Sequence, residues 1–265
     1  MKIGIVYKKE KVRDKDVVPR LISRFRSRGC AVKVIHTGAE LHGVDCVVVL
    51  GGDGALLHAA VIAGKQDIKV VGVNYGNLGF LSEFEAAETD KVVDLVCGEH
   101  TVLPRTILEI NLDDKTVYAL NETVLQRDYT RSYGHQVARF GLILNGEKIQ
   151  NYVADGLAIA TPTGSTAYSL SAGGSILAPD VRAFIVTPIC AMGLRTRPLV
   201  VSDSGEFSFD LSEEKEDLKL YADGRPVGTV TKTTRLTIRR APFTAEFVTR
   251  DVNRLFQAVN RKLFG

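Results

Sequence analysis

Asp53, in the glycine-rich turn Gly51-Gly52-Asp53-Gly54, is the side chain of this sequence best placed to do chemistry. The turn follows the apolar run 44–50, which is typical of a strand buried on both faces of a parallel sheet. Residues 55–60 have the composition of a helix that begins at once. Open α/β sheets bind ligands at the carboxyl ends of their strands, and a helix N-terminus attracts phosphate. Asp53 is therefore a candidate to orient a metal ion or accept a proton. The alternative is a tight turn whose Asp caps the helix.

Two common nucleotide-binding motifs do not describe this turn. Gly64-Lys65 is followed by Gln66, so the chain lacks the Ser or Thr of a Walker motif there. Gly52-Asp53-Gly54 begins a GxGxxG pattern, but its last position is Leu57. The turn thus matches neither a Walker-type kinase nor a standard dehydrogenase.

Other turns carry polar groups of different kinds. Gly72–Phe80 has three glycines, and Phe80 suits either stacking on a base or filling a core. Leu120-Asn121-Glu122 places an amide and a carboxylate at the end of a β segment, a pair that matches the hydroxyls of a ribose or is a surface pair. The hydroxyl-rich turn Thr161–Tyr168 suits phosphate or adenine contacts, or is an ordinary helix start. Asp223-Gly224 is an acidic turn between strands, most simply a hairpin turn.

Alternating strand and helix patterns surround these motifs in the first hundred residues. Strands are expected at 2–7, 31–35, 44–50 and 69–73, and helices at 16–28, 55–60 and 90–96. Repeated βα units of this length predict a doubly wound parallel sheet. Gly29 and Gly98 are placed to end two of the helices.

After Pro104 the pattern changes to short alternating strands. They are expected at 107–112, 117–120, 140–144, 147–152, 157–160, 206–211, 218–222, 235–239 and 245–248, with a short helix at 167–171. Asn145-Gly146 is a strong type I′ hairpin signal. Residues 251–264 predict an amphipathic helix with one apolar face, made of Val252, Leu255, Phe256, Val259 and Leu263. The second half is therefore an antiparallel, β-rich domain.

The composition favours a folded protein that binds a small anionic ligand. Hydrophobic residues make up 45% of the 265 residues, enough for one large domain or two smaller ones. A net charge of +3 does not argue for a nucleic-acid partner. The basic stretch of Arg20, Arg24, Arg26 and Arg28 is expected to be a solvated helix face.

Cysteine spacing and apolar run lengths indicate an intracellular protein. Cys30, Cys46, Cys97 and Cys190 form no CxxC pair, so we expect reduced, mostly buried thiols and no zinc site. The start of the sequence, MKIGIVYKK, resembles a strand rather than a signal peptide. No apolar run reaches about 18 residues, so a cytoplasmic protein without a membrane partner is expected.

Four of the motifs together resemble the NAD kinase family. They are GGDG at Gly51–Gly54, GVNYGNLGF at Gly72–Phe80, LNE at Leu120–Glu122 and DG…TPTGSTAYSLSAGG at Asp155–Gly174, in the family's order and approximate spacing. GGDG is shared with diacylglycerol and sphingosine-type kinases and with 6-phosphofructokinases. The last motif is highly specific, and the resemblance covers nearly the whole chain.

The resemblance implies an α/β plus β fold. Residues 1–99 would form a Rossmann-like α/β domain, and residues 100–240 a β-rich, antiparallel, sandwich-like NAD-binding domain. Residues 241–265 would form a C-terminal segment and helix that return to the first domain. NAD would bind between the domains and receive the γ-phosphoryl group of ATP on its adenosine 2′-hydroxyl, which gives NADP. Mg²⁺ or another divalent metal would accompany ATP, without metal ligands from the protein, and the enzyme would be a homodimer or homotetramer.

The resemblance also implies a role for individual residues. Asp53 would be the general base, because a ribose hydroxyl is a poor nucleophile until a carboxylate takes its proton. Charge neutralisation by the metal on the triphosphate would supply much of the remaining catalysis. The expected dinucleotide-binding residues are Gly52, Gly54, His58, Phe80 (packing on adenine), Asn121 and Glu122 (holding ribose), Asp155 (at the nicotinamide end), Thr163, Thr166, Ala167, Tyr168, Ser171, Asp223 (near the acceptor site) and Arg225.

Three positions depart from the family pattern, and two other functions are alternatives. Ala55 replaces a common Thr, Ser175 a common Pro, and Arg225 a common Gln. A lipid kinase sharing GGDG would need an acyl cleft and membrane access, and the sequence shows no obvious amphipathic anchor. A non-catalytic dinucleotide sensor would not need Asp53. An assay for NADP formation separates these functions.

Overall fold

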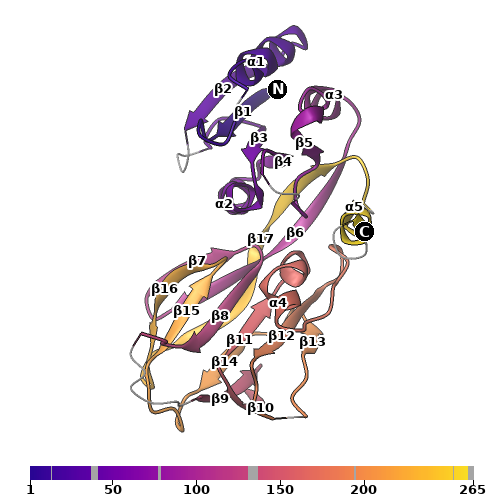
Figure 1. Cartoon of the computed structure of the whole chain (residues 1–265). Helices are drawn as coiled ribbons and strands as arrows, with labels where there is room; N and C mark the ends of the chain where they lie inside the picture. The colour runs from indigo at the N-terminus through magenta and orange to yellow at the C-terminus, as the bar shows by residue number, and fades with distance from the viewer. Residues whose placement is uncertain are drawn as a thin grey trace. The chain divides into compact units, whose positions relative to one another are not determined.

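The computed structural model describes residues 1–261 except 13, 37–40, 77–78, 131–136, 194 and 253. The chain divides into two compact units. Unit 1 contains Met1–Arg105 and Phe243–Gly265, and unit 2 contains Thr106–Pro242. Figure 1 gives the labels of the helices and strands used below.

A parallel sheet forms the centre of unit 1, in the order β5-β4-β3-β1-β2. Its central strand β3 is completely buried, which explains its nearly continuous apolar sequence. The order of strands reverses between β1 and β3, the position at which open α/β sheets bind ligands. The strands are β1 (Lys2–Tyr7), β2 (Ala31–His36), β3 (Cys46–Gly51), β4 (Lys69–Asn74) and β5 (Phe84–Glu85).

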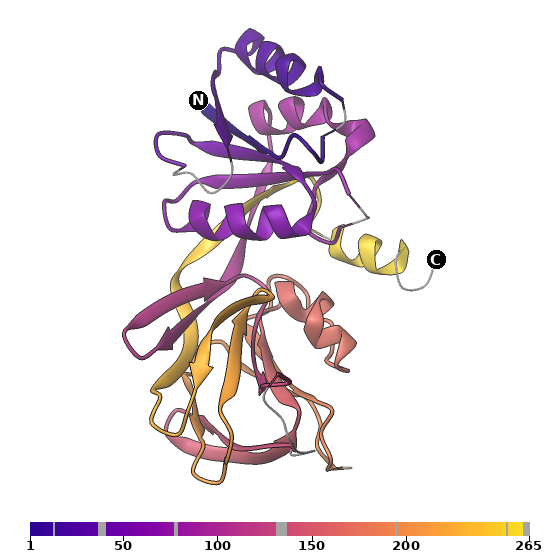
Figure 2. The same ribbon diagram turned by 60° about the vertical axis from the view of Figure 1, so that its left-hand side comes forward.

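Helices cover both faces of this sheet, as the doubly wound prediction requires (Figure 2). Helices α1 (Val17–Ser27) and α3 (Lys91–Cys97) pack on one face, and α2 (Asp53–Gly64) on the other. The short 3₁₀ helix η1 (Ala86–Glu88) precedes α3. Alternate sheet residues such as Ile5, Val48 and Val71 contribute to the core under α1 and α3. The predicted α/β architecture is thus confirmed.

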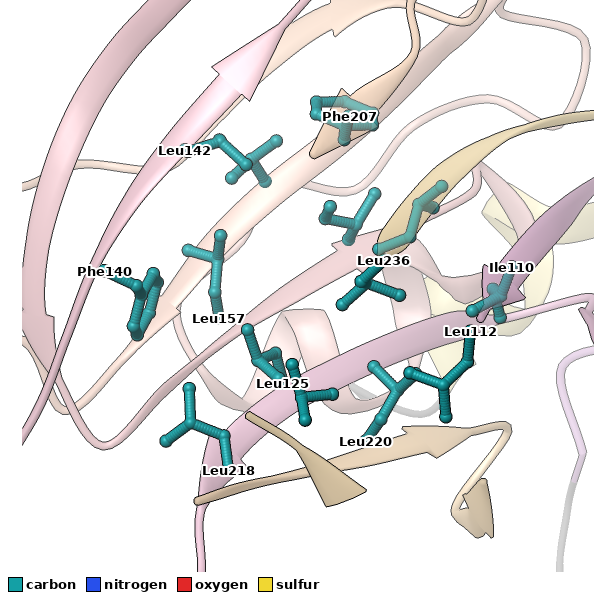
Figure 3. Close-up of a cluster of buried hydrophobic side chains, with 14 of the residues drawn as sticks. Ile110, Leu112, Leu125, Phe140, Leu142, Leu157, Phe207, Leu218, Leu220 and Leu236 are labelled. Atoms are coloured by element: carbon teal, nitrogen blue, oxygen red, sulfur yellow. The ribbon is translucent and has the colours of Figure 1, made fainter. Parts of the chain in front are cut away.

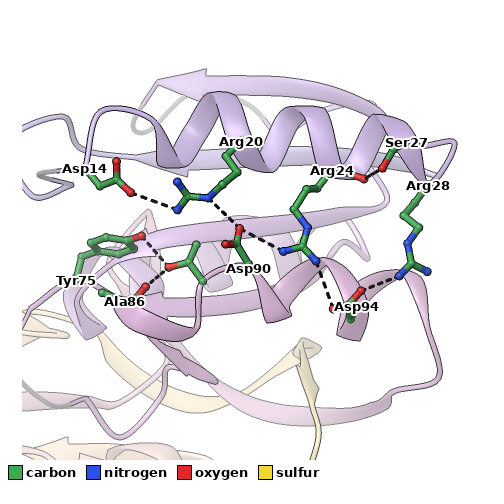
Figure 4. A network of polar contacts seen from close by, with 10 residues as sticks. Asp14, Arg20, Arg24, Ser27, Arg28, Tyr75, Ala86, Asp90 and Asp94 are labelled. Atoms are coloured by element: carbon green, nitrogen blue, oxygen red, sulfur yellow. Dashed lines mark hydrogen bonds and ion pairs between the residues drawn. The ribbon is translucent and has the colours of Figure 1, made fainter.

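The basic stretch on α1 lies against acidic residues of α3 and its N-terminal cap (Figure 4). Arg20 and Arg24 pair with Asp90 at 3.1 and 3.5 Å, and Arg28 pairs with Asp94 at 2.8 Å. These side chains remain about half exposed, so the expectation of a solvated helix face is confirmed. Exposed pairs of this kind contribute about 0–1 kcal/mol each and mainly fix the register of the two helices.

Two antiparallel sheets form unit 2, and their facing side chains make one core (Figure 3). One sheet has the order β13-β12-β11-β8-β15-β16, and the other contains β10-β9-β14-β17 with β6 and β7. The predicted antiparallel sandwich is confirmed. Its strands are β6 (Thr101–Leu112), β7 (Lys115–Ala119), β8 (Glu122–Arg127), β9 (Ala138–Leu144), β10 (Glu147–Ala154), β11 (Gly156–Ala160), β12 (Ala183–Ile189), β13 (Leu199–Ser202), β14 (Phe207–Asp210), β15 (Leu218–Ala222), β16 (Arg225–Val230) and β17 (Leu236–Thr249).

Several predicted elements have different bounds or surroundings. The two strands expected at 235–239 and 245–248 are one continuous strand, β17, whose end pairs with β4 at Phe247 and Val70. The sequence analysis did not predict β8, β12, β13 or β16. The helix expected at 167–171 begins at Tyr168 and is a single turn, α4 (Tyr168–Ser171), which follows the 3₁₀ helix η2 (Thr163–Thr166). Asn145 and Gly146 have φ of 53° and 84°, as a type I′ turn requires.

The C-terminal helix and the cysteines also differ from expectation. Helix α5 (Arg254–Val259) buries Leu255 and Val259, whereas Val252 and Phe256 are each 48% exposed and Leu263 lies outside the described residues. Cys30 and Cys46 are buried, but Cys190 is exposed, so the expectation of mostly buried thiols is wrong for that residue. No helix in the described part of the chain is long and apolar enough to cross a membrane.

Candidate active site

Asp53 is the first residue of α2, and Gly52 occupies the cap position before it. The Asp53 carboxylate therefore does not cap its own helix. It accepts a hydrogen bond from the N–H of Phe80 at 2.8 Å and a longer one from the N–H of Leu81 at 3.4 Å. The Phe80 amide ends the second sequence motif and the Leu81 amide directly follows it, so unit 1 brings the first and second motifs together.

Gly79 makes this contact between the two motifs possible. A Cβ atom at residue 79 would overlap the Asp53 carboxylate, so only glycine lets the backbone approach it this closely. Earlier in the same motif, the Asn74 side chain accepts from Gly76 N–H and donates to Glu85, each at 3.0 Å. Residues 77–78 of the motif lie outside the described residues.

The remaining expected residues of unit 1 are Gly52, Gly54, His58 and Phe80. A Cβ at Gly52 or Gly54 would meet no described atom within 4 Å, so packing does not require glycine at these two positions. His58 lies one turn further along α2 and is half-buried, as is Phe80. A cavity of about 630 Å³ opens at the same edge of the sheet. Its lining consists of Glu10, Lys11, Asp14, Asn74, Tyr75, Gly76, Glu85, Ala86 and Ala87.

In unit 2, the turn that carries Asn121 and Glu122 is held by the Asp223 carboxylate. Its two oxygens accept hydrogen bonds from the N–H groups of Leu120, Asn121 and Glu122, at 2.9, 2.7 and 3.3 Å. Asn121 lies between β7 and β8, and Glu122 begins β8 rather than ending a strand. The third motif and the acidic hairpin turn are therefore parts of one cluster.

The hydroxyl-rich turn of the fourth motif packs against the same residues. Thr161 Oγ1 donates to the carbonyl of Leu120 at 2.6 Å, and Thr161 N–H donates to the carbonyl of Asn121 at 2.8 Å. A Cβ at Gly164 would overlap the Asn121 backbone, so this glycine lets the two turns touch. Thr163 and Thr166 are buried within η2, Ala167 is half-buried, and Ser171 is exposed at the end of α4.

Two polar atoms in this cluster are buried without a hydrogen-bond partner among the described residues. They are Oε2 of Glu122 and Oγ1 of Thr163. Buried polar groups are nearly always paired, so such atoms mark a place where a ligand or water supplies the partner. Burial, followed by the nearby Asp223 charge, raises the pKa of Glu122 to about 7, although the Tyr168 N–H opposes this shift.

The far end of β11 carries Asp155, which pairs with Arg127 at 3.0 Å. In the β8–β11 register, Ala160 lies opposite Glu122 and Gly156 opposite Gln126. Asp155 therefore lies about 16 Å along the extended strand from Ala160, the residue that is paired with Glu122. The sequence analysis missed Arg127, whose guanidinium also lies 4.5 Å from the Tyr129 ring. Only the antiparallel pairing of β8 and β11 identifies this partner of Asp155.

Tyr168 and Arg225, like Ser171, are exposed. Tyr168 is 44% exposed and lies within electrostatic range of Tyr129, Glu122 and Asp155. Arg225 begins β16 and acts electrostatically on Asp223. Unit 2 thus presents an aromatic ring, carboxylates, a guanidinium and buried hydroxyls from β8, η2, α4, β16 and the residue before β11, a combination suited to an elongated polar ligand.

Comparison with known proteins identifies sequence relatives over both units. Residues 5–101 match the ATP-NAD kinase N-terminal domain, and residues 120–250 match the ATP-NAD kinase C-terminal domain. An NAD kinase of Carboxydothermus hydrogenoformans is 36% identical over 262 residues, covering 96% of this chain and 91% of that protein. An NAD kinase of Bacteroides fragilis is 38% identical over 225 residues, covering 83% of this chain and 76% of the relative.

Solved structures with the same fold cover the entire chain. A yeast NADH kinase in complex with NADH superposes with a TM-score of 0.83 at 28% identity, covering 100% of this chain and 87% of that one. An NAD kinase from Archaeoglobus fulgidus in complex with ATP has a TM-score of 0.75 at 26% identity, covering 100% and 98%. The sequence relatives and the structural neighbours therefore indicate the same family.

Proposed function

Because the chain belongs to the NAD kinase family, we propose that it transfers the γ-phosphoryl group of ATP to the adenosine 2′-hydroxyl of NAD, which gives NADP. The match of both kinase domains to the sequence, at residues 5–101 and 120–250, carries this conclusion. The protein is a phosphotransferase with an alcohol group as acceptor. Unit 1 supplies the base and unit 2 the residues that recognise NAD, with domain boundaries near residues 100 and 240.

The unpaired polar atoms of unit 2 support recognition of NAD. Glu122 Oε2 and Thr163 Oγ1 are buried and lack partners among the described residues, so ribose hydroxyls and the adenine amine are suitable partners. Asn121, Thr166, Ala167, Tyr168 and Ser171 complete the adenosine contacts in this proposal. Asp155, about 16 Å along β11 from Ala160, is the residue for the nicotinamide end.

Asp53 is the general base of the proposed reaction. A carboxylate within hydrogen-bond distance of the 2′-hydroxyl takes its proton as the new P–O bond forms. The Phe80 and Leu81 amides orient the carboxylate, while each of its oxygens keeps a further lone pair for the substrate. Gly52 and Gly54, which leave open space beside it, suit phosphate and NAD contacts by the backbone.

ATP brings its own divalent metal in this proposal. No group of three His, Cys, Asp or Glu side chains that could hold a metal ion occurs in the described residues. A magnesium ion on the triphosphate would neutralise charge during transfer. The cavity of about 630 Å³ in unit 1 has the size of a nucleotide pocket, and its lining includes one basic side chain, Lys11, beside three acidic ones, Glu10, Asp14 and Glu85.

Location and assembly complete the proposal. The four cysteines are free, including Cys30 and Cys97, whose Sγ atoms lie 3.7 Å apart, which supports a reducing, cytoplasmic location. A homodimer or homotetramer follows from the family resemblance.

The function is tested by incubating the purified protein with NAD, ATP and Mg²⁺ and measuring NADP with an NADP-specific dehydrogenase. NADP should form, and EDTA should stop its formation until excess Mg²⁺ is added. Parallel reactions replace ATP by polyphosphate, and NAD by NADH or by diacylglycerol vesicles. Phosphorylation of the lipid without any NADP would contradict the proposal, and so would NAD binding without turnover under every donor.

A further inference from the structure

Both oxygens of the Asp223 carboxylate accept hydrogen bonds from the protein backbone. Oδ2 accepts the N–H of Leu120, and Oδ1 accepts the N–H groups of Asn121 and Glu122. The N–H of Asp223 also donates to the carbonyl of Glu122 at 3.0 Å. An ionised carboxylate has about four acceptor positions, and three are occupied here.

We infer that Asp223 is a positioning residue, which holds the Asn121–Glu122 backbone in the shape that presents both side chains to NAD. This inference rests on the proposed function and departs from the expectation that Asp223 itself contacts the dinucleotide. The chemistry it serves is recognition of the ribose and adenine groups, not phosphoryl transfer.

Among the described residues, no other acceptor bonds the N–H groups of Leu120 and Asn121. Leu120 and Asn121 lie between β7 and β8, so a sheet ladder does not use their N–H groups. Their carbonyl groups are taken by Thr161, through its hydroxyl and its N–H. Asp223 satisfies the donors on one side and Thr161 the acceptors on the other, which fixes the turn completely.

The fold places Asp223 at this position through its hairpin. Asp223 and Gly224 have φ of 45° and 72°, values of a two-residue type I′ turn between β15 and β16. Strand β15 also pairs with β8, with Ala222 opposite Thr123. The turn therefore emerges directly beside Glu122, and Asp is one of the few residues that both tolerate this φ and carry acceptors.

The Asp223 charge has a second effect on Glu122. Two carboxyl groups in a buried cluster disfavour a second negative charge, so Glu122 keeps its proton more readily. At Glu122 the Tyr168 N–H on α4 opposes this effect. Burial raises the pKa of Asp223 as well, whereas the N–H groups of the Leu120–Glu122 turn, and then Arg225 on β16, favour its charged form. Removing the Asp223 charge should therefore make the Glu122 proton easier to lose.

The chain offers a matched control for substitutions of Asp223. Asp113 lies in the β6–β7 hairpin of the same unit with a similar φ of 51°. Its Oδ1 also accepts a backbone N–H, that of Arg235, at 2.9 Å. At both residues, substitution by alanine or asparagine removes or weakens hydrogen bonds from backbone N–H groups to a carboxylate, and both residues have a positive φ.

The experiment measures NAD binding by calorimetry, together with kcat and both KM values, for Asp223→Ala, Asp223→Asn, Asp113→Ala and Asp113→Asn. We expect Asp223→Ala to weaken NAD binding by about ten- to a hundredfold, while kcat and the KM for ATP change less than about threefold. Asp223→Asn retains one acceptor oxygen and should lie between Asp223→Ala and the wild type. It should also move the pH midpoint of NAD binding, expected near Glu122's pKa of about 7, to lower pH. Both Asp113 variants should bind NAD normally.

The outcomes separate this inference from the proposed function. If the wild type makes NADP but both Asp223 variants, folded by circular dichroism, bind NAD normally, Asp223 is not a positioning residue. A fall in kcat without weaker NAD binding would instead make Asp223 part of the chemistry and would also overturn the inference. If Asp223→Ala does not fold, the NAD affinity of Asp223→Asn decides whether Asp223 is a positioning residue. A wild type that forms no NADP contradicts the proposed function, whereas the calorimetry still tests the positioning role.

Discussion

The carboxylate of Asp53 accepts hydrogen bonds from the N–H groups of Phe80 and Leu81, so the protein orients it before a substrate arrives. Its residue type and its place after a buried strand were visible in the sequence. The two amides were not, because backbone donors carry no side-chain signature and lie 27 and 28 residues away. The same holds for Asp223, whose three backbone donors lie more than 100 residues earlier.

Substitution of Asp53 tests its role as the general base. We expect Asp53→Asn to lower kcat by about 10²–10⁴-fold, the usual contribution of a general base, with a smaller change in NAD affinity. Steady-state kinetics and calorimetry measure the two quantities. Thermal unfolding is the control, since Asn also weakens one of the amide contacts. Near-normal turnover in the folded variant would exclude Asp53 from the mechanism.

The buried carboxyl of Glu122 predicts a pH dependence of stability. Its pKa of about 7 lies above the 4.5 of an unperturbed glutamate, so the folded state binds the proton more tightly than the unfolded state. The free energy of unfolding of the wild type should therefore fall, relative to that of Glu122→Gln, as pH rises from about 4.5 to about 7. Above about pH 7 the difference between the two proteins should stay constant. Urea unfolding of both proteins between about pH 5 and pH 8 measures this. Parallel pH profiles would show that Glu122 is not the titrating group.

At the scale of elements, the site consists of turns that rigid strands present. The sequence predicted β1–β4, the hairpin at Asn145-Gly146 and the hydroxyl-rich turn, because buried parallel strands and φ-specific turns have strong local signals. It did not predict that β17 is continuous or that α4 is one turn long. The continuity of β17 depends on tertiary pairing, since β17 is held by strands that precede it by many residues.

Gly79→Ala tests the contact between the two motifs of unit 1. The added methyl group would overlap the Asp53 carboxylate and push it from the Phe80 and Leu81 amides. We expect kcat to fall at least about tenfold, because misplacing a catalytic group by about 1 Å is costly. Gly54→Ala is a control for the added volume, since a Cβ there meets no described atom within 4 Å. It should affect the KM values more than kcat. Wild-type kcat in Gly79→Ala would show that the amide contacts do not position Asp53.

At the scale of the whole molecule, the two units have separate cores but share strands. Strands β6 and β17 each contribute residues to both units. In unit 1, Arg250 just after β17 pairs with the buried Glu83 at 2.9 Å and lies 4.4 Å from the Phe84 ring. The sequence indicated two domains from the change in pattern after Pro104. The family resemblance also implied that residues 241–265 return to the first domain, but a parallel pairing such as Val70 with Phe247 has no local signal that would identify β4 as the neighbour of β17.

Loss of Arg250 should destabilise unit 1. Arg250→Ala removes the guanidinium from the 5%-exposed Glu83 side chain and should cost about 3 kcal/mol. Arg20→Ala, which removes two exposed ion pairs with Asp14 and Asp90, is the control and should cost less than about 1 kcal/mol. Chemical denaturation followed by circular dichroism compares them. Equal stability losses would mean that the Glu83 pair contributes no more than a surface pair.

The shared strand β17 has a consequence for the order in which the protein is made. A ribosome completes residues 106–242, all of unit 2, before it adds the end of β17, which pairs with β4 in unit 1. Domains generally fold as units during synthesis. The second unit therefore has its complete sequence first, while the parallel sheet that carries Asp53 still lacks a neighbour strand and the Arg250 contact to Glu83. The base of the proposed reaction thus reaches its finished surroundings only when the last segment of this sequence emerges from the ribosome.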